Sequence, residues 1–434
     1  MSKIKEKIYY KIKFKLAEPL SVGSGLNNQT DSDVIVDKIG KPYIPGSSIA
    51  GVCSSLFDEK TRKKYFGFVE ISTSASMSSS SRKSDICFYD ALLCENTRFE
   101  ISNRNFVALD ECKVSIEGSK FDREVVEPGA AFVTYIEVNV TDDNEDIKNV
   151  AEKIISAWDR NTLHFGAKTM RGLGAICKTS ISIKVFNFTD KVSVNEYIKF
   201  DMFDGKTQWD SLKIESESDD NVEISLSLQL KLMGAISVRE YTTEVSETEA
   251  PMPDYKSLTV SDEENAVKEN PVVPGASWAG AFLHRLRELE PDIDWGNLFG
   301  MVTSGEKKKS RIRFSETVIR DTTPMVMTRT AVDRFSGGAV DGALYTERTY
   351  YGNSDENKSD AALNICIKDY ELTEGEISAL AATIADLNEG ILSVGGLTSV
   401  GRGIFKIKSI NGEEVASSEE VFEFVKEILK KGAV

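Results

Sequence analysis

The feature that most constrains this chain is a repeat in the positions of its glycines and prolines. Five of these positions recur 229 residues later: Pro42, Gly46, Gly166, Gly172 and Gly174 return as Pro271, Gly275, Gly395, Gly401 and Gly403. Chance rarely places five such matches in one register. The chain of 434 residues is therefore predicted to be a tandem duplication of two domains, each of roughly 200 residues.

Both halves are predicted to contain the same elements in the same order. Apolar and polar residues alternate over 8–16 and over 224–232, which is typical of half-buried strands. A helix is expected after each Pro-x-x-Pro-Gly turn. The apolar face of the first copy is formed by Ile49, Val52, Cys53, Leu56 and Phe57. A second helix is expected over 147–158 and over 377–387, followed by a glycine loop and a last strand.

This order predicts an α+β fold made of two tandem ferredoxin-like (RRM-like) domains, with helices covering one face of each sheet. A doubly wound sheet is the alternative, but each half has too few helices per strand for it. We predict domains at residues 1–205 and 206–434, with the boundary inside the polar and acidic segment 201–221.

Composition excludes several classes of protein. No stretch reaches about 18 consecutive apolar residues, and the first residues alternate instead of forming a signal-peptide core, so we expect a cytoplasmic protein without a membrane partner. The six cysteines form no CxxC pair and indicate neither a zinc knuckle nor a disulfide framework. Only two histidines are present, His164 and His284, which excludes a histidine-rich metal centre.

The charge pattern is uneven. A net charge of −16 argues against a nucleic-acid partner, because phosphate binding needs clustered Lys and Arg. Basic residues nevertheless concentrate in 11–15, 81–84 and 306–313. A local basic groove on an acidic body is therefore compatible with the sequence.

The glycine loops, GAKTMRGLG (166–174) and GGLTSVGRG (395–403), match neither a dinucleotide fingerprint nor a P-loop. Their glycines would let backbone amides approach a phosphate closely, as in an anion nest. A tight turn with positive φ explains them equally well.

Together, these motifs resemble the RAMP superfamily, in particular the backbone subunits of type III CRISPR effector complexes and the fused proteins of subtype III-D. PYIPGSSIAG (42–51), a VALDECK…EVVEPG segment and GAKTMRGLGAI carry the resemblance in the first half. VVPGASWAG, LFG and GGLTSVGRGIF carry it in the second half. The resemblance implies RRM-like domains that assemble along a guide RNA, with a protruding hairpin that separates stretches of the guide–target duplex.

The resemblance also implies which residues contact the guide. The glycine loop and the first helix would bind its backbone. The RNA-binding candidates are Ser47, Ser48, Lys168, Arg171, Gly172, Gly174, Ser277, Gly401, Arg402 and Gly403. A plain helix N-cap is the alternative for Ser47. The segments Asp110–Glu124 and Asp333–Glu347 would form the hairpins, with an exposed salt-bridged turn as the alternative.

The subunits of this family that cut target RNA carry an aspartate between the first strand and the proline-glycine turn, and Asp31 lies there. Its carboxylate would recruit a divalent cation (Mg or Mn) or orient a ribose 2′-hydroxyl. The alternative is that Asp31, Asp33 and Asp37 are loop and turn residues. Asp254 is the only aspartate in the corresponding loop of the second half and is the second catalytic candidate.

The resemblance thus implies a guide-RNA-binding backbone subunit that cleaves complementary target RNA in a metal-dependent manner. Its partners would be guide RNA, single-stranded target RNA and other CRISPR effector subunits. The alternatives are a non-catalytic RNA-binding scaffold of the same complex and a guide-processing endoribonuclease. The scarcity of histidine counts against the endoribonuclease. A purely protein-binding module would leave the glycine loops unexplained.

Overall fold

A computed structural model of the chain describes residues 3–25, 30–70, 80–110, 114–212, 214, 223–241, 253–261, 269–302, 307–353, 355, 361–368 and 370–431. The chain divides into two compact units. Unit 1 comprises Met1–Val107, Glu117–Thr169 and Leu173–Ser218, and unit 2 comprises Ala108–Ile116, Met170–Gly172 and Asp219–Val434. Among the described residues, no helix combines the length and the apolar character needed to cross a membrane.

Unit 1 is built on an antiparallel sheet with the order β10-β9-β1-β8-β4. Its described helices and strands are β1 (Ile4–Leu16), α1 (Gly46–Ser54), α2 (Glu59–Tyr65), β2 (Phe68–Glu70), β3 (Ser80–Arg82), β4 (Ile86–Phe88), β5 (Leu92–Leu93), β6 (Ile101–Phe106), β7 (Phe121–Val126), β8 (Ala131–Thr141), α3 (Ile147–Asp159), β9 (Ile176–Asn187), α4 (Lys191–Ile198) and β10 (Asp210–Ser211). Without the edge strand β10, the order is fourth, first, third, second along the chain. This is the ferredoxin-like βαββαβ arrangement that the sequence predicts.

Unit 2 repeats this arrangement in the order β19-β23-β11-β24, again antiparallel. Its described helices and strands are β11 (Glu223–Met233), β12 (Ala235–Ile236), β13 (Arg239–Tyr241), β14 (Tyr255–Ser257), β15 (Thr259–Ser261), β16 (Glu269–Val273), α5 (Gly275–Leu289), α6 (Gly296–Phe299), β17 (Met301–Val302), β18 (Lys307–Lys308), β19 (Ile312–Phe314), β20 (Thr317–Val318), β21 (Thr323–Arg329), β22 (Tyr345–Tyr351), β23 (Ala361–Lys368), α7 (Glu374–Glu389), β24 (Ile404–Ile410), β25 (Glu413–Glu414) and α8 (Ser418–Lys431). The predicted tandem α+β fold is confirmed.

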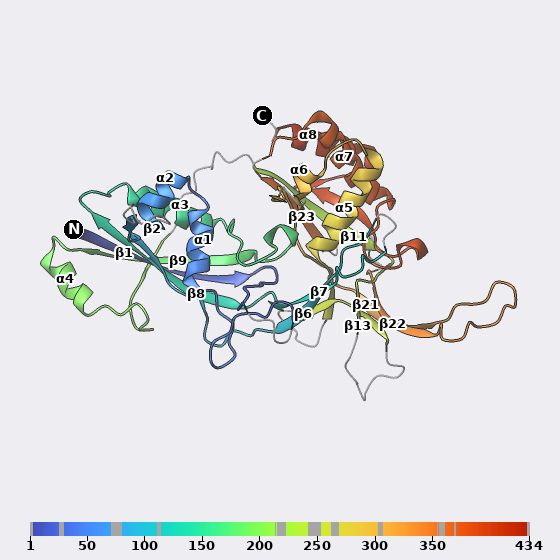
Figure 1. Cartoon of the computed structure of the whole chain (residues 1–434), viewed down its shortest axis with the longest axis horizontal. Helices are drawn as coiled ribbons and strands as arrows, with labels where there is room; N and C mark the ends of the chain where they lie inside the picture. Colours follow the sequence, from blue (N-terminus) through green and yellow to red (C-terminus); the bar gives the residue numbers. More distant parts are fainter. Residues whose placement is uncertain are drawn as a thin grey trace, which may run out of the picture. The chain divides into compact units, whose positions relative to one another are not determined.

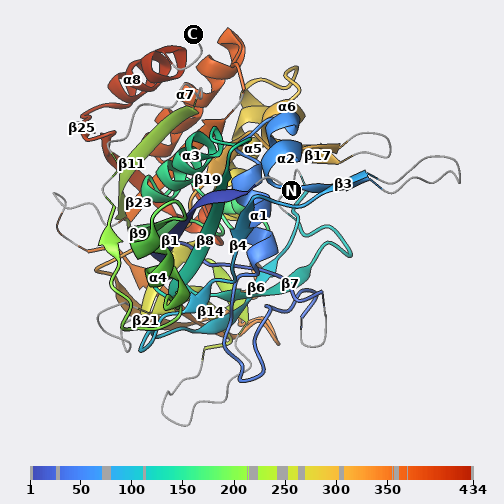
Figure 2. The ribbon, with the colours of Figure 1, turned by 90° about the vertical axis from the view of Figure 1, so that its left-hand side faces the viewer.

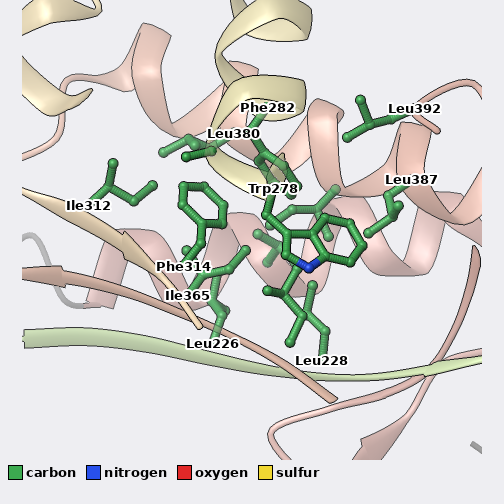
Figure 3. Packing of buried hydrophobic residues seen from close by; sticks show 14 of the residues in the cluster. Leu226, Leu228, Trp278, Phe282, Ile312, Phe314, Ile365, Leu380, Leu387 and Leu392 are labelled. Carbon is green, nitrogen blue, oxygen red and sulfur yellow. The ribbon is translucent and has the colours of Figure 1, made fainter. Parts of the chain in front are cut away.

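One face of each sheet is covered by helices and forms the core. In unit 1, α1 and α3 cover the face that carries Ile12 and Phe14, and the ring of Phe14 lies 5.0 Å from that of Trp158 on α3 (Figure 1). In unit 2, Trp278 and Phe282 on α5 point between the helices and the sheet, where side chains of β11, β19, β23 and α7 meet them (Figure 3). The alternating residues of the first strand in each half are buried as predicted.

The opposite face of the first sheet is partly covered by α4 and the segment that follows it (Figure 2). The rings of Phe203 and Trp209 lie 5.3 Å and 5.9 Å from that of Tyr135 on β8, and β10 pairs with β9. Residues up to 212 of the expected boundary segment therefore pack against the first sheet, whereas 213 and 215–221 lie outside the described residues. The boundary at 205 and 206 stays a prediction.

The first helix is shorter than its apolar spacing predicts. The helix α1 ends at Ser54, so Leu56 and Phe57 lie in the turn after it. The hydroxyls of Ser54 and Ser55 donate to the carbonyls of Gly51 and Val52 and so satisfy the last turn. Asp58 then caps α2 through the amide of Thr61.

The glycine loops are held by matching backbone hydrogen bonds in both units. The amide of Gly174 donates to Pro19 at 2.8 Å, and that of Gly403 donates to Ala235 at 2.8 Å. Each of these glycines also accepts from the amide at the start of its loop, Phe165 or Val394. A Cβ on either glycine would overlap that residue's carbonyl oxygen, and both have positive φ, +82° and +68°. The structure therefore requires glycine at these turns.

We predict that Gly403→Ala lowers the free energy of unfolding by about 2 kcal/mol, because the backbone must move to make room for the methyl group. The control is Gly280→Ala on α5, where a Cβ meets open space. There a gain of about 0.7 kcal/mol is expected from the helix propensity of alanine. Urea denaturation measures the free energy of unfolding of both variants. Equal changes in the two variants would contradict the packing argument.

Candidate nucleic-acid interface

Asp31 is an exposed residue fixed to the start of β7. Its Oδ2 accepts from the amide of Asp122 at 3.0 Å, and its own amide donates to Oδ1 of Asp122 at 2.9 Å. Among the described residues, no hydrogen bond reaches the other carboxylate oxygen of Asp31. The structure thus presents one fixed carboxylate to solvent beside the β6–β7 hairpin.

The two neighbouring aspartates have structural roles. Asp33 is buried and accepts from the amide and hydroxyl of Thr30. Asp37 accepts from the amides of Ile39 and Lys41 and closes a turn. The loop-and-turn alternative therefore describes Asp33 and Asp37.

Lys168 from the glycine loop approaches the same end of β7. Its Nζ lies 5.1 Å from the centroid of the Phe121 ring, within cation–π range. Phe121 stacks on Phe106 of β6, with ring centroids 5.1 Å apart. Because Phe121 precedes Asp122, the structure brings Lys168, an aromatic pair and Asp31 to one place in unit 1.

The other predicted residues of this loop are less accessible. Arg171 is half-buried, and burial lowers the pKa of its guanidinium. Gly172 and Gly174 are buried and have positive φ. In the first glycine loop, Lys168 is therefore the exposed cation.

The N-terminus of α1 lines a groove. The N-cap is Pro45, so the alternative that Ser47 is a plain N-cap is wrong. Ser47 is exposed, Ser48 is half-buried, and the amide of Gly46 donates to Asp90 Oδ1 at 2.7 Å. The groove of about 480 Å³ runs between α1 and α2 and is lined by Ser47, Gly51, Ser54, Arg62, Lys63, Phe66 and Phe88, among others. Its basic side chains lie on α2, which the sequence analysis did not select. Ser277, the counterpart of Ser48, is half-buried on α5.

Asp254 in unit 2 is bonded to a hairpin strand through its side chain, as Asp31 is in unit 1. It is exposed, its Oδ2 accepts from the amide of Thr346 on β22 at 2.7 Å, and its own amide donates to the Thr346 carbonyl at 2.7 Å. Thr346 occupies the start of the second hairpin strand, as Asp122 does in unit 1. In both catalytic candidates Oδ2 accepts from an amide of the second hairpin strand, whereas the candidate's own amide donates to a side-chain carboxylate in unit 1 and to a backbone carbonyl in unit 2.

A buried ion pair lies next to Asp254. Glu347, 1% exposed, receives two hydrogen bonds from Arg402, 3% exposed, at 2.8 Å and 2.5 Å. The Nε of Arg329 lies 3.0 Å from Glu347 Oε1. Burial alone would raise the pKa of the Glu347 carboxyl, but the bond to Arg402 and the charges of Arg402, Arg329 and Arg239 outweigh it and hold the pKa below its ordinary value.

Sequence reasoning selected Arg402 for RNA and did not identify its partner. The structure binds this guanidinium to Glu347, while Gly401 remains exposed and Gly403 is buried. The repeat contained a signal for the pair, because Arg402 replaces the buried Leu173 of the first copy. A charge at a core position needs a buried partner.

Two ferredoxin-like units, each with a glycine loop, a hairpin and an anchored aspartate, define a tandem protein of the RRM-like class. A family model described as the RAMP superfamily matches residues 13–177 and 257–406. The chain belongs to the RAMP superfamily, whose members are CRISPR-associated RNA-binding proteins that work in complexes with RNA and other subunits. A comparison with curated proteins finds no match to this chain.

We predict that Glu347→Gln lowers the free energy of unfolding by about 3 kcal/mol at neutral pH, because it leaves Arg402 buried without a counter-charge. The ionised Glu347 stabilises the fold fully above its ordinary pKa of 4.5, and this contribution is lost as pH falls through the lower pKa of the folded state. The difference between wild type and variant should therefore shrink in acid.

Urea denaturation from neutral to acidic pH measures this difference. The matched control is Glu389→Gln, an exposed position at the end of α7 that should stay close to wild type at every pH. A difference that does not change with pH would contradict the assignment of the low pKa to Glu347.

Proposed function

We propose that the chain is a guide-RNA-binding backbone subunit of a type III CRISPR ribonucleoprotein, most similar to the fused proteins of subtype III-D, and that it cleaves complementary target RNA at two positions. The carrying observation is the shared anchoring of Asp31 and Asp254. Two loops with different sequences each hold an exposed carboxylate against the second strand of a hairpin, β7 in unit 1 and β22 in unit 2.

The proposed reaction is attack of a ribose 2′-hydroxyl on the adjacent phosphate. A bond forms between O2′ and phosphorus, and the bond from phosphorus to O5′ breaks. The proton leaves O2′, the departing O5′ takes up a proton, and the products are a 2′,3′-cyclic phosphate and a 5′-hydroxyl. The exposed carboxylate oxygen of Asp31 is suited to accept a hydrogen bond from the 2′-hydroxyl and to orient it.

The donor set at Asp31 fits a divalent cation. The exposed carboxylate of Asp31 lies beside the half-buried carboxylate of Asp122, and magnesium is commonly held by one or two carboxylates together with a substrate phosphate. Among the described residues, no group of three or more His, Cys, Asp or Glu side chains is arranged to hold a metal. We propose that Asp31, with Asp122, holds Mg²⁺ or Mn²⁺, which when bound would neutralise charge on the phosphate.

Guide binding is proposed to use the exposed cations of unit 1. Lys168 lies at the glycine loop, while Arg62 and Lys63 line the groove that contains Ser47. Backbone phosphates in single-stranded RNA are bound by such side chains without regard to sequence.

The second hairpin supplies a surface suited to bases. The strands β21 and β22 pair over seven residues, and the hairpin extends as an arm (Figure 1, orange). Its loop exposes Phe335 and Leu344, which are 96% and 69% exposed. Apolar and aromatic side chains of this kind stack on or separate nucleobases, which supports a role in dividing the guide–target duplex.

We predict that Lys168→Glu and Arg62→Glu each reduce the guide RNA that copurifies with the assembled complex, because each replaces attraction to phosphate by repulsion. The absorbance ratio at the nucleic-acid and protein maxima measures the occupancy. Lys199→Glu, an exposed residue after α4 with the same charge change, is the control. Wild-type occupancy in both variants would contradict this interface.

We predict that Asp31→Asn and Asp254→Asn each slow their own set of target cuts by about 100-fold or more and leave target binding intact. Asparagine keeps the hydrogen bond to β7 or β22 and removes the charge, so the variant separates chemistry from loop anchoring. Mapping the cleavage products of the assembled complex checks this.

Asp37→Asn is the control on the same loop, since it retains the turn that Asp37 closes. If Asp31→Ala and Asp254→Ala leave every product at the wild-type rate, the chain is an RNA-binding scaffold without catalysis.

A further inference from the structure

Unit 2 carries more positive charge around Asp254 than its buried ion pair needs. Three guanidinium groups, of Arg239, Arg329 and Arg402, act on the single carboxylate of Glu347. One of them neutralises this carboxylate, so two guanidinium charges remain beside the single exposed carboxylate of Asp254. A surplus of guanidinium groups at a partly buried site is suited to bind an anion.

The surplus charges belong to the side chains that reach solvent. Arg402 is buried with Glu347, whereas the side chain of Arg329 is 36% exposed and Arg239 is an exposed residue. Arg239 also lies over the ring of Tyr255, with its guanidinium carbon 5.2 Å from the ring centroid. Arg402 thus fixes Glu347 in the interior. Nearer the surface, Glu347 holds Arg329 and the ring of Tyr255 holds Arg239.

These arginines lie on strands that position Asp254. Tyr255, the residue after Asp254, pairs with Glu347 in the parallel register of β14 and β22. Asp254 itself is bonded to Thr346, the residue before Glu347. Arg239 on β13 pairs with Ser257 of the same β14 strand. The catalytic candidate and the cationic cluster therefore share one small sheet.

Unit 1 lacks this arrangement at the corresponding positions. Glu124, which corresponds to Glu347, accepts from the amide of Val34 at 2.9 Å. Arg123 donates to the hydroxyl of Ser21, and Leu173 replaces Arg402. The first site presents the carboxylates of Asp31 and Asp122 beside one lysine, Lys168, whereas the second presents the carboxylate of Asp254 beside two arginines.

We propose that Arg239 and Arg329 form a binding site for a backbone phosphate of single-stranded RNA beside Asp254. This proposal rests on the proposed function. It places Arg239 and Arg329 at the phosphate of the second cleavage position. As the bond from O2′ to phosphorus forms, the non-bridging oxygens gain negative charge, which two preorganised guanidiniums stabilise. Cleavage at the second site consequently needs divalent cations less than cleavage at the first.

The binding part of the proposal is tested on the full chain with a fluorescein-labelled oligouridine RNA. Each lost phosphate contact lowers the slope of log affinity against log salt by about 0.7 for a single strand, and Arg239 and Arg329 share one phosphate, so Arg239→Gln with Arg329→Gln should lower it by about 0.7. Arg287→Gln on α5, an exposed arginine, should leave the slope unchanged. A double variant with the slope of this control would overturn the phosphate site.

The catalytic part is tested on the assembled complex, with the two sets of cuts followed separately during a Mg²⁺ titration. The double glutamine variant should slow only the second set, by about 100-fold, and raise the Mg²⁺ concentration it requires. Arg239→Lys and Arg329→Lys, which preserve charge and folding, should retain part of the rate. Equal slowing of both sets, or an unchanged second set, would overturn the proposal.

The two failures are distinguishable. If Asp254→Ala abolishes the second cuts while the arginine variants do not affect them, the proposed function stands and the phosphate site is wrong. If Asp254→Ala changes no product while the salt slope still falls in the arginine variants, the phosphate site stands and catalysis at Asp254 is wrong.

Discussion

The structure depends on a contact between backbone atoms that leaves no room for a side chain. Gly174 and Gly403, the glycines before the last core strands, each lie against the carbonyl of the residue at the start of their loop. The amide of each glycine donates to the segment that follows the first strand of its unit. This contact ties the last core strand to the chain that leads into the aspartate loop. The aspartate loops thus start from a fixed point of the core sheet, and each aspartate is then bonded to a hairpin strand.

The two units use this common frame for different electrostatics. The first unit places Asp31, Asp122 and Lys168 at one end of its hairpin, and the second places three arginines around the buried Glu347. The hydrogen bond that anchors the aspartate is the same in both. The charge around the site therefore differs between the copies, while the bond to the aspartate side chain is kept.

Much of the fold could be predicted from the sequence because its signals are local or periodic. Alternation identified the first strands, helical spacing identified α3 and α7, and the repeat register located both glycine loops. The ends of helices were harder to predict from the sequence. The helix α8 begins at Ser418, but the preceding Ser417 caps it by accepting from the amide of Glu420, and the Ser418 hydroxyl accepts from the side-chain amide of Asn388.

The candidate site could be predicted only in part. Asp31 followed from the resemblance to the RAMP superfamily, and Asp254 from the position of the corresponding loop in the repeat. The partner of Arg402 did not, because Glu347 meets it through strand pairings between segments far apart in the chain. Periodicity gives no information about such pairings, so the arginine cluster emerged only from the three-dimensional arrangement.

The replacement of Leu173 by Arg402 has an evolutionary consequence. In an assembly of identical single-domain subunits, every copy carries every mutation, so a buried arginine must be tolerated at all positions along the filament at once. Fusion of two copies in one gene removes that constraint, since each copy mutates alone. The two sites of a duplicated chain can therefore diverge. Covalent linkage keeps the two types of site alternating along an assembly.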